Sequence, residues 1–578
     1  MRHATQLARF FPILLLAGCA SGQPQSTSGS SPSQPAVSQT LVIGIRYEPA
    51  TLAVKVLQSN GPKNATRSFN AALSVIDDKG EARPYLAESL PQLSTNAWKV
   101  LPDGRMETTY RLRDGTTWHD GAPLTADDFV FTFKVYKGSG LAVFISSPQD
   151  AIDTVQAPDP RTLIVSWKAL NANAGSLGFE DLDPLPTHLF ETPFNEFMEG
   201  RTTADAFLGN PLWASEYVGA GPFKLASWDP GVQLQGTAFE GHILGRPKFD
   251  RLVEKIILDD NTTIPAILAG DQVDYACCNT LRFDHYVTLK REWEALGKGT
   301  TVSTLGAAVF LFLQQRPEYV GNRALLDLRV RRALAHAIDR QALNDGLFDS
   351  LGAPTDTPVP PNVYFYPDVE RLMTKYPLDA NRSSQLMSEA GFTRDSQGFY
   401  VDSQGERFFV DFAVQAASEI ERMQTLLSDI WRRAGFEVHT VVVGPQQYTQ
   451  LETRHTLPGL GYAFFPTQGE QAFLSSQVGT AANRWAGNNR GAWTNPEYDR
   501  IYTAWNSTLD PAERGRDVAQ LMALISENMP GYPLYFSQSV AAWRSGLRGV
   551  TTATDSSGFG QTARSTIAFW NIYEWSVK

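Results

Sequence analysis

The sequence predicts an α/β fold that is divided into more than one domain. A chain of 578 residues is too long for one hydrophobic core, and its 42% hydrophobic and 19% charged residues are typical of a globular protein. Two successive segments each follow a helical pattern with a glycine stop, at Gly391 and at Gly435, and the second continues into a strand that contains Val438. Helices and strands that alternate in this way favour an α/β lobe.

The composition narrows the classes of function. The formal net charge is -11 and no basic run is present, so nucleic acid is not the expected partner. The chain carries 13 Trp, 19 Tyr and 32 Phe, which is enough aromatic surface to line a large cleft.

The chain begins with a short apolar segment that ends in a cysteine. Arg2 and Arg9 precede the apolar run 10–17, which is too short for a permanent membrane anchor. Small residues then lead to Cys19, a pattern that resembles a bacterial lipoprotein signal with Cys19 as the lipidated residue. The alternative is an ordinary signal peptide with a chance cysteine. Residues 20–40 are rich in Ser, Gly, Pro and Gln, which predicts a flexible tether. We therefore expect an extracytoplasmic protein held to the cell membrane by lipid.

The remaining cysteines are the neighbours Cys277 and Cys278. We expect both to be buried free thiols, because adjacent cysteines pair only as a strained ring. No histidine or cysteine pair flanks them at ligand spacing, so a metal site is not predicted.

Folded structure is expected to start at the apolar strand 41–45, which is followed by Tyr47 and Glu48. Residues 106–113 alternate like a half-buried strand. Beyond it, Thr125 is a predicted N-cap with Asp128 in the first helical turn. His119, Asp120 and Asp128 could suggest acid–base chemistry, but turn and capping roles explain them better.

A helix is predicted within the stretch 322–343, with Asp327 as its cap. Val330, Ala333, Leu334, Ala337 and Ile338 form one apolar stripe. The opposite face, taken alone, is typical of a solvated basic face made by Arg329, Arg331, Arg332 and Arg340.

The segment Gly219-Ala220-Gly221-Pro222 is too short for a phosphate-binding fingerprint. Pro222 also removes an N–H group that a phosphate cradle would need. We therefore expect no nucleotide site at this segment.

Two long phrases carry a specific resemblance. Residues 116–132 and 328–340 resemble signatures of the family 5 extracellular solute-binding proteins, the oligopeptide- and dipeptide-binding subunits of bacterial ABC importers. About seven such motifs cover most of residues 41–578. The resemblance implies a two-lobed, clamp-like periplasmic-binding-protein fold of type II with an extra subdomain in the first lobe. The implied parts are a signal peptide (1–18), a tether (19–40), lobe I (41–70, 206–303 and 538–578), its extra subdomain (71–205) and lobe II (304–537).

The resemblance also implies a function. Two hinged lobes would close on a peptide, and a separate permease and ATPase would transport it, with no cofactor and with a monomeric binding protein. A secreted hydrolase is the competing class, but no Gly-x-Ser-x-Gly or His-Glu-x-x-His motif is present. A non-peptide cargo such as an oligosaccharide or a metal chelate remains the alternative within the family.

The candidate ligand contacts are Tyr47, Glu48, Arg454, Tyr462, Phe464, Phe465, Glu470 and Trp485. In the peptide-binding relatives an aspartate meets the peptide's α-ammonium, whereas Phe465 stands at that place here. Either Glu470 supplies the acid, or an aromatic wall faces a cargo without a free amine there. The wall would consist of Tyr462, Phe464, Phe465 and Trp485. A third interpretation makes these aromatic residues core. We favour the aromatic wall and a cargo that is blocked, cyclic or not a standard peptide. Arg454 matches an arginine that can meet a peptide carboxylate.

Overall fold

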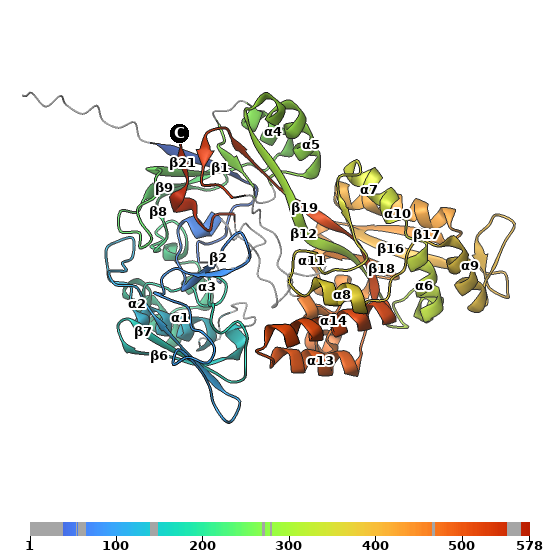
Figure 1. Cartoon of the computed structure of the whole chain (residues 1–578), viewed down its shortest axis with the longest axis horizontal. Coiled ribbons are helices and arrows are strands. Elements are labelled where there is room, and N and C mark those ends of the chain that lie inside the picture. The colour runs from blue at the N-terminus through green and yellow to red at the C-terminus, as the bar shows by residue number, and fades with distance from the viewer. Residues whose placement is uncertain are drawn as a thin grey trace, which may run out of the picture. The chain divides into compact units, whose positions relative to one another are not determined.

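The computed structural model describes residues 39–578 except 54, 56–64, 139–140, 142–147, 269–271, 278–279, 465–468 and 552–567 (Figure 1). The predictions for Cys19, Phe465 and Cys278, and nearly all of the tether, fall outside these residues. None of the helices in the described part combines the length and apolar character needed to cross a bilayer.

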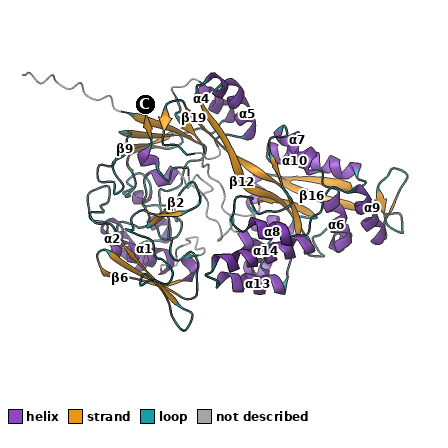
Figure 2. Ribbon diagram, in the orientation of Figure 1, coloured by secondary structure: helices purple, strands orange, loops and turns teal. Residues whose placement is uncertain are grey.

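The largest element is an 11-stranded sheet in the order β17-β16-β18-β12-β19-β11-β1-β10-β9-β8, with β13 also paired to β19 (Figure 2). Its strands are β1 (Thr40–Ile45), β8 (Phe223–Asp229), β9 (Gln233–Ala238), β10 (Arg251–Ile256), β11 (Tyr275–Ala276), β12 (Gly299–Leu313), β13 (Ala353–Pro354), β16 (Phe409–Gln415), β17 (Glu437–Val443), β18 (Leu460–Phe464) and β19 (Gly531–Arg544). The predicted first strand is confirmed as β1, which lies between β10 and β11 in the middle of one half of this sheet.

Fourteen α-helices lie in the described part of the chain. They are α1 (Ala126–Gly138), α2 (Thr187–Met198), α3 (Ala204–Leu208), α4 (Asp260–Leu268), α5 (Phe283–Glu292), α6 (Leu328–His336), α7 (Arg340–Phe348), α8 (Tyr366–Leu372), α9 (Ala380–Glu389), α10 (Ser418–Arg433), α11 (Pro445–Thr449), α12 (Leu451–Thr456), α13 (Pro496–Asn506) and α14 (Pro511–Asn528).

The two predicted helix–glycine units are confirmed. Gly391 and Gly435 follow α9 and α10 with φ of 94° and 91°, a left-handed conformation that favours glycine at a helix end. After Gly435 the chain enters β17, as the pattern predicted.

Strands β12 and β19 connect two hydrophobic cores. The first core holds β1, β10 and β11 together with the end of β19, and the second holds Val309, Leu311 and Leu313 of β12 and the start of β19. Between these cores, residues 302–307 of β12 and Ser537–Ser539 of β19 are all partly exposed. The two strands are antiparallel partners, with a register shift between Leu305 and Ala308. A two-stranded ribbon with little packing at its centre therefore joins the two cores.

A smaller four-stranded sheet has the order β4-β5-β7-β6. Its strands are β4 (Trp98–Val100), β5 (Met106–Arg111), β6 (Ile152–Asp159) and β7 (Thr162–Trp167). The alternating burial of β5 confirms the predicted half-buried strand. This sheet has a core of its own that includes Trp118 and Trp167. Helices α1 and α2 contribute residues to the core around β1, although the predicted boundaries place them in the extra subdomain. Phe207 of α3 joins the same core and lies just beyond the predicted boundary, in lobe I.

Asp128 has a structural role at the start of α1. One carboxylate oxygen accepts hydrogen bonds from the Thr125 N–H group, at 2.9 Å, and from the Trp118 indole, at 3.2 Å. The other oxygen accepts from the Thr187 N–H group at 3.0 Å. Since all these donors are fixed parts of the fold, Asp128 ties α1 to two loops.

The prediction of one helix that carries the apolar stripe from Val330 to Ile338 is wrong in extent, because the structure has two helices in this stretch. Asp327 caps α6 as predicted, by accepting from the Arg329 N–H group at 2.8 Å. The helix then ends at His336, and Asp339 caps α7 by accepting from the Ala342 N–H group at 2.8 Å. A second good N-cap within the apolar pattern therefore starts a new helix.

The predicted solvated basic face is also wrong for part of the motif. Arg331 is 8% exposed and donates to the carbonyl oxygens of Leu325, Leu326 and Asn528 at 2.8–3.2 Å. Arg340 donates to the carbonyl oxygens of Thr355 and Pro533, and burial lowers its pKa to about 10. These two arginines hold turns and strand ends in place.

Gly219 and Gly221 are needed for a close approach of two backbones. A Cβ atom on Gly219 would lie 2.1 Å from the Phe69 carbonyl oxygen, and one on Gly221 would lie 2.4 Å from the Asn70 nitrogen. The buried ring of His119 bridges the same segment, contacting the Gly221 carbonyl oxygen at 3.0 Å and the Gly219 N–H group at 3.2 Å. Burial lowers the pKa of His119 to about 4, so the ring is neutral at neutral pH.

Cys277 is buried and disulfide-bonded, so the prediction of a free thiol is wrong at this position. The two other cysteines of the chain, Cys19 and Cys278, lie outside the described residues. The prediction of a free thiol was based only on the strain of a disulfide between adjacent cysteines, and such strain does not exclude a disulfide bond.

Candidate functional site

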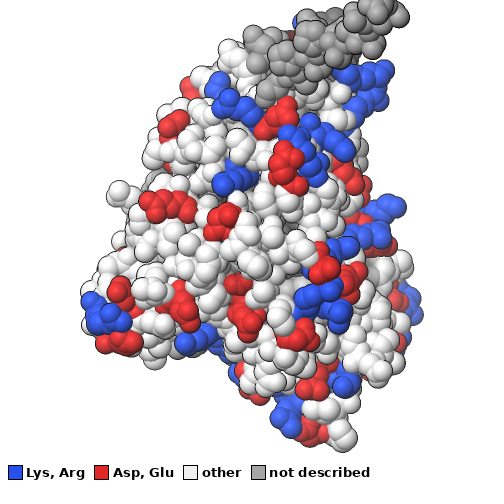
Figure 3. Space-filling view, turned by 90° about the vertical axis from the view of Figure 1, so that its left-hand side faces the viewer, with Lys and Arg blue, Asp and Glu red and all other residues white. Residues whose placement is uncertain are grey.

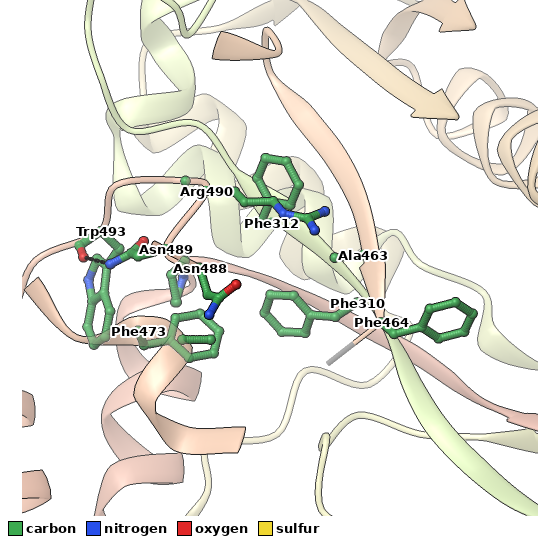
Figure 4. Close-up of a pocket in the computed structure, with 12 residues that line it drawn as sticks. Phe310, Phe312, Ala463, Phe464, Phe473, Asn488, Asn489, Arg490 and Trp493 are labelled. Atoms are coloured by element: carbon green, nitrogen blue, oxygen red, sulfur yellow. Dashed lines mark hydrogen bonds between the residues drawn. The ribbon is translucent and has the colours of Figure 1, made fainter. Parts of the chain in front are cut away.

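A pocket with an empty volume of about 540 Å³ lies against one face of β12 and β18 (Figure 4). The lining residues come from β12, β18, the 3-10 turn Gly469–Phe473, the loop before α13 and the residue before β19, and they are Phe310, Phe312, Ala463, Phe464, Ala472, Phe473, Asn488, Asn489, Arg490, Gly491, Trp493 and Pro530.

Four aromatic rings form the apolar part of this pocket. Phe310 and Phe312 lie two residues apart on β12, so both point to the same face of the sheet. Phe473 meets Phe310 edge-on at a centroid distance of 5.6 Å and Trp493 at 6.0 Å. Figure 4 shows these rings around a common space, whereas the Phe464 ring points away from it. The arrangement suits an apolar or aromatic group.

The loop before α13 is held in an unusual backbone conformation. Arg484, Trp485 and Ala492 have φ of 56–60°, which is uncommon for residues other than glycine. The Asn489 side-chain amide donates to the carbonyl oxygens of Trp493, at 2.7 Å, and Leu474, at 3.1 Å. A Cβ atom on Gly491 would lie 2.3 Å from the Leu313 carbonyl oxygen. These contacts fix the loop that carries Arg490 against β12.

Basic side chains gather at one edge of the pocket. The Arg490 guanidinium donates to the Tyr448 hydroxyl oxygen at 3.3 Å, and Tyr448 in turn donates to the Tyr462 carbonyl oxygen at 2.9 Å. Arg454 on α12 donates to the Thr449 carbonyl oxygen at 3.3 Å. Burial first, and then the charge of Arg490, lower the pKa of Arg454.

Arg316 and His455 lie behind this edge. Arg316 donates to the carbonyl oxygens of His455 (2.8 Å), Arg490 (3.2 Å) and Gly479 (2.6 Å), so it links the end of β12 to the loop. His455 is 1% exposed, and burial followed by the charge of Arg316 lowers its pKa to about 4. The imidazole is therefore neutral at pH 7, and the positive charge of the region belongs to the arginines.

The predicted aromatic residues do not all lie together. Tyr462 is 7% exposed and faces the core on the other side of β18 from the pocket, in contact with the Phe464 ring at a centroid distance of 5.5 Å. Phe464 is 47% exposed at the pocket mouth. Trp485 instead contacts the rings of Tyr319 and His455 at 6.4 and 6.3 Å.

The other predicted site residues have identifiable places. Glu470 is 1% exposed, and its carbonyl oxygen accepts from the Tyr498 hydroxyl at 2.6 Å. Glu48 accepts from the Trp228 indole, at 2.6 Å, and from the Gly231 N–H group, at 3.0 Å, at the β8–β9 turn. Tyr47 is 42% exposed beside the guanidinium of Arg46.

Sequence reasoning missed Phe310, Phe312, Phe473, Trp493 and Arg490. The first two lie in the apolar run 308–313, which the sequence analysis did not single out as a site. The available signal was the alternation of residues along 308–313, which places both rings on one face. No pattern in the sequence brings the loop of Arg490 to that face.

Nothing in the described part of the chain suggests a metal centre, because no group of three or more His, Cys, Asp or Glu side chains could hold an ion. On the face shown in Figure 3, acidic and basic side chains are interspersed, with no large area of one sign. That face therefore offers no extended basic surface of the kind that binds nucleic acid.

Comparison with known proteins identifies the family. Residues 84–509 match the family described as "Bacterial extracellular solute-binding proteins, family 5 Middle". Oligopeptide-binding protein AppA of Bacillus subtilis (strain 168) is 23% identical over 571 residues, which cover 95% of this chain and 96% of AppA. Heme-binding protein A of Haemophilus influenzae is 22% identical over 552 residues, which cover 91% of this chain and 93% of the relative.

The fold is shared with solved structures. The oligopeptide-binding protein of Thermus thermophilus, complexed with a pentapeptide, superposes with a TM-score of 0.72 at 21% identity. The match covers 93% of this chain and 96% of that one, and it confirms the predicted two-lobed α/β fold. These relatives are extracytoplasmic solute-binding proteins rather than enzymes. Because the family match spans well over half of the chain, the protein belongs to the family 5 bacterial extracellular solute-binding proteins.

Proposed function

We propose that this protein captures a peptide or peptide-like solute between two hinged lobes and delivers it to an ABC importer. The observation that carries the proposal is the β12–β19 ribbon, which joins two separate cores and is partly exposed at its centre. Such a ribbon can bend without disturbing either core. A solute that contacts both lobes would stabilise the closed state by its differential affinity for that state.

The aromatic pocket supports an unusual cargo. Phe465 occupies the sequence position at which the peptide-binding relatives carry an acid for the α-ammonium. Glu470 lies buried nearby, with its carbonyl bound to Tyr498, and we do not expect it to replace that acid. The proposed contacts are Phe464, Phe465, Arg454 and the pocket rings, and the proposed cargo is blocked, cyclic or otherwise not a standard peptide. Tyr47, Glu48, Tyr462 and Trp485 stay predicted contacts.

A metal chelate is the second candidate, because a relative of similar extent is named a heme-binding protein. Heme is a flat, apolar ring system with carboxylate groups, and an aromatic pocket with a basic edge could accommodate part of such a molecule. The peptide-like cargo takes precedence because AppA and the Thermus protein are both named for oligopeptides.

The proposed location is the outer side of the cytoplasmic membrane or the cell surface. A lipid on Cys19 would hold the protein there, and the residues up to 40 would serve as a tether. The permease and ATPase would be separate polypeptides, and the binding protein would act as a monomer.

Mass spectrometry of cargo released from the purified protein tests the proposed function. We expect a small peptide-like molecule, and addition of that cargo should lower the radius of gyration in solution scattering. A scattering curve unchanged at saturation would contradict the hinge. A free peptide and its N-acetylated form should bind about equally. A roughly hundredfold loss of affinity on acetylation, together with a similar loss of affinity for the free peptide in the Glu470→Gln variant, would contradict this cargo. The cargo would then be an ordinary peptide with a free α-amine.

A further inference from the structure

We infer that the cargo carries an acidic group next to an apolar ring, and that Arg490, assisted by Arg454, binds the acid while the aromatic pocket takes the ring. The inference rests on the proposed function, and it names the chemical class of the cargo. Its starting point is a pair of arginines that belong to two separate segments, α12 and the loop before α13.

The Arg490 guanidinium has more N–H donors than its contact with Tyr448 uses. A guanidinium has five N–H donors in a planar fork, which matches the two oxygens of a carboxylate. Among the described residues, the Tyr448 hydroxyl at 3.3 Å is the one side-chain acceptor recorded for Arg490. Since the Tyr448 hydrogen is directed to the Tyr462 carbonyl oxygen, its oxygen is left to accept from Arg490. Tyr448 therefore orients the fork and leaves most of its donors available.

Arg454 brings a second positive charge to the same edge. Its Nε atom is buried with no hydrogen-bond partner in the described structure, and its single recorded bond is made by Nη2. Arg454 donates to the carbonyl oxygen of Thr449, and Arg490 donates to the hydroxyl of the adjacent residue, Tyr448, so the two guanidinium groups contact neighbouring residues of one segment. The charge of Arg490 accordingly contributes, after burial, to the lowered pKa of Arg454. Two like charges brought together in this way are unfavourable, and an anion bound between them would remove that cost.

No carboxylate of the described chain neutralises this pair. The ion pairs found among the described residues include neither Arg454 nor Arg490. Glu452, on the same helix as Arg454, is exposed. In a chain with a formal net charge of -11, an uncompensated pair of arginines is not explained by a surplus of basic residues. The geometry leaves the acidic partner to be supplied by the ligand.

The ring site adjoins the acid site because Arg490 lines the aromatic pocket as well. Figure 4 shows the Arg490 side chain reaching toward Phe312, across the space that Phe310 and Phe473 border. An acid held by Arg490 would thus lie a short linker away from a ring stacked among these aromatic residues. This combination selects an aryl or similarly apolar acid over a neutral analogue of the same shape.

A matched pair of probes tests the inference. The probes are 3-phenylpropionate and 3-phenylpropionamide, which share the ring and linker and differ in charge. Affinities are measured by ligand-observed NMR titration of the cargo-free protein. We expect the acid to bind about tenfold to a hundredfold more tightly than the amide, as a charge-assisted pair would give. Added salt should weaken binding of the acid and leave the amide unchanged.

Variants assign the effect to the named residues. Arg490→Met should abolish the preference for the acid, and Arg454→Met should reduce it. Arg484→Met is the matched control, because Arg484 is an exposed residue of the same loop outside the pocket lining. If Arg490→Met does not fold, two other measurements decide whether arginines bind the acid. They are the salt dependence of acid binding in the wild type and the titration of Arg454→Met with both probes. The inference would be overturned if the acid and the amide bound equally, or if neither bound. It would also be overturned if the preference for the acid survived in both Arg490→Met and Arg454→Met.

Failure of this inference can be told apart from failure of the proposed function. A released cargo without an acidic group would overturn the acid site and leave solute capture intact. A protein that releases no cargo and keeps an unchanged scattering curve would instead contradict the function itself.

Discussion

The Ser303 hydroxyl donates a hydrogen bond of 2.8 Å to the side-chain oxygen of Gln538, and so bridges β12 and β19 where both strands lie between the two cores. Nearby on β12, Gly306 lies so close to Ser537 that a Cβ atom would be 2.4 Å from its hydroxyl oxygen. The ribbon is therefore closely fitted between its own strands although it has little packing on its faces.

Gly306→Ala should destabilise the protein by roughly 1–3 kcal/mol, because the new methyl group displaces the Ser537 hydroxyl and lies 3.1 Å from the Ser537 carbonyl oxygen. The free energy of unfolding, from a urea titration, measures the effect. The double variant Gly306→Ala/Ser537→Ala removes the closest atom and should recover much of the loss. A single variant as stable as the wild type would show that the ribbon adapts freely at this point.

Two arginines of the same helix should respond differently to truncation. Arg331→Met leaves the carbonyl oxygens of Leu325, Leu326 and Asn528 without this donor, which should cost roughly 1–3 kcal/mol. Arg329→Met is the matched control, because Arg329 is exposed and pairs with Asp327 at the surface. Its thermal midpoint should stay at the wild-type value. A similar loss in both variants would mean that helix propensity, rather than burial, sets the cost.

Glu254 should make stability fall as the pH rises. Its side chain is fully buried in β10, one oxygen accepts from the Ser68 hydroxyl at 2.8 Å, and the other has no partner in the described structure. Burial raises the pKa of Glu254 to about 8, so the folded protein keeps a proton that the unfolded chain loses near pH 4.5. The stability that the protonated Glu254 side chain contributes is complete below about pH 4.5, and it is lost as the pH rises through about 8.

Glu254→Gln tests this linkage. The free energy of unfolding, from urea titrations between about pH 5 and pH 8, should decline in the wild type by up to about 1.4 kcal/mol per pH unit. In the variant this part of the decline should vanish. The exposed Glu216→Gln variant is the control and should follow the wild type. Parallel pH profiles of wild type and Glu254→Gln would contradict the buried, protonated carboxyl group.

Cys19→Ser tests the proposed lipid anchor. Without the thiol no diacylglyceryl group can be attached, and the protein should appear in a detergent-free soluble fraction. Several acyl chains hold a protein firmly at a membrane, whereas one chain holds it only weakly. Fractionation followed by immunoblotting measures the distribution. A variant that stayed with the membrane would remove the support for a lipoprotein.

Local patterns predicted the regular elements well. The alternation of residues 106–113 predicted β5, and the stops at Gly391 and Gly435 predicted where α9 and α10 end, because these signals depend on neighbours in the chain. The cap by Asp327 was found for the same reason. Asp339 was missed as a cap because the apolar stripe continues through Ala337 and Ile338, which are buried outside any helix.

Contacts between distant segments were not predictable in the same way. The burial of Arg331 depends on Asn528, which lies 197 residues further along the chain. The aromatic pocket depends on Gly491, which lets its loop touch β12 at Leu313. Neither relation leaves a periodic trace in the sequence, so the arginine was interpreted as solvated and the pocket rings were not recognised as a site.

The core around β1 has a consequence for how the protein is made. Leu41 of β1 and the fully buried Trp575 belong to this one core, and Trp575 packs beside Tyr275 at a centroid distance of 5.0 Å. A ribosome adds residues in order, so this core stays incomplete until residue 575 has been synthesised. During nearly all of its synthesis the chain therefore lacks a finished first core, and the exposed apolar residues of β1 wait for a partner that is made last.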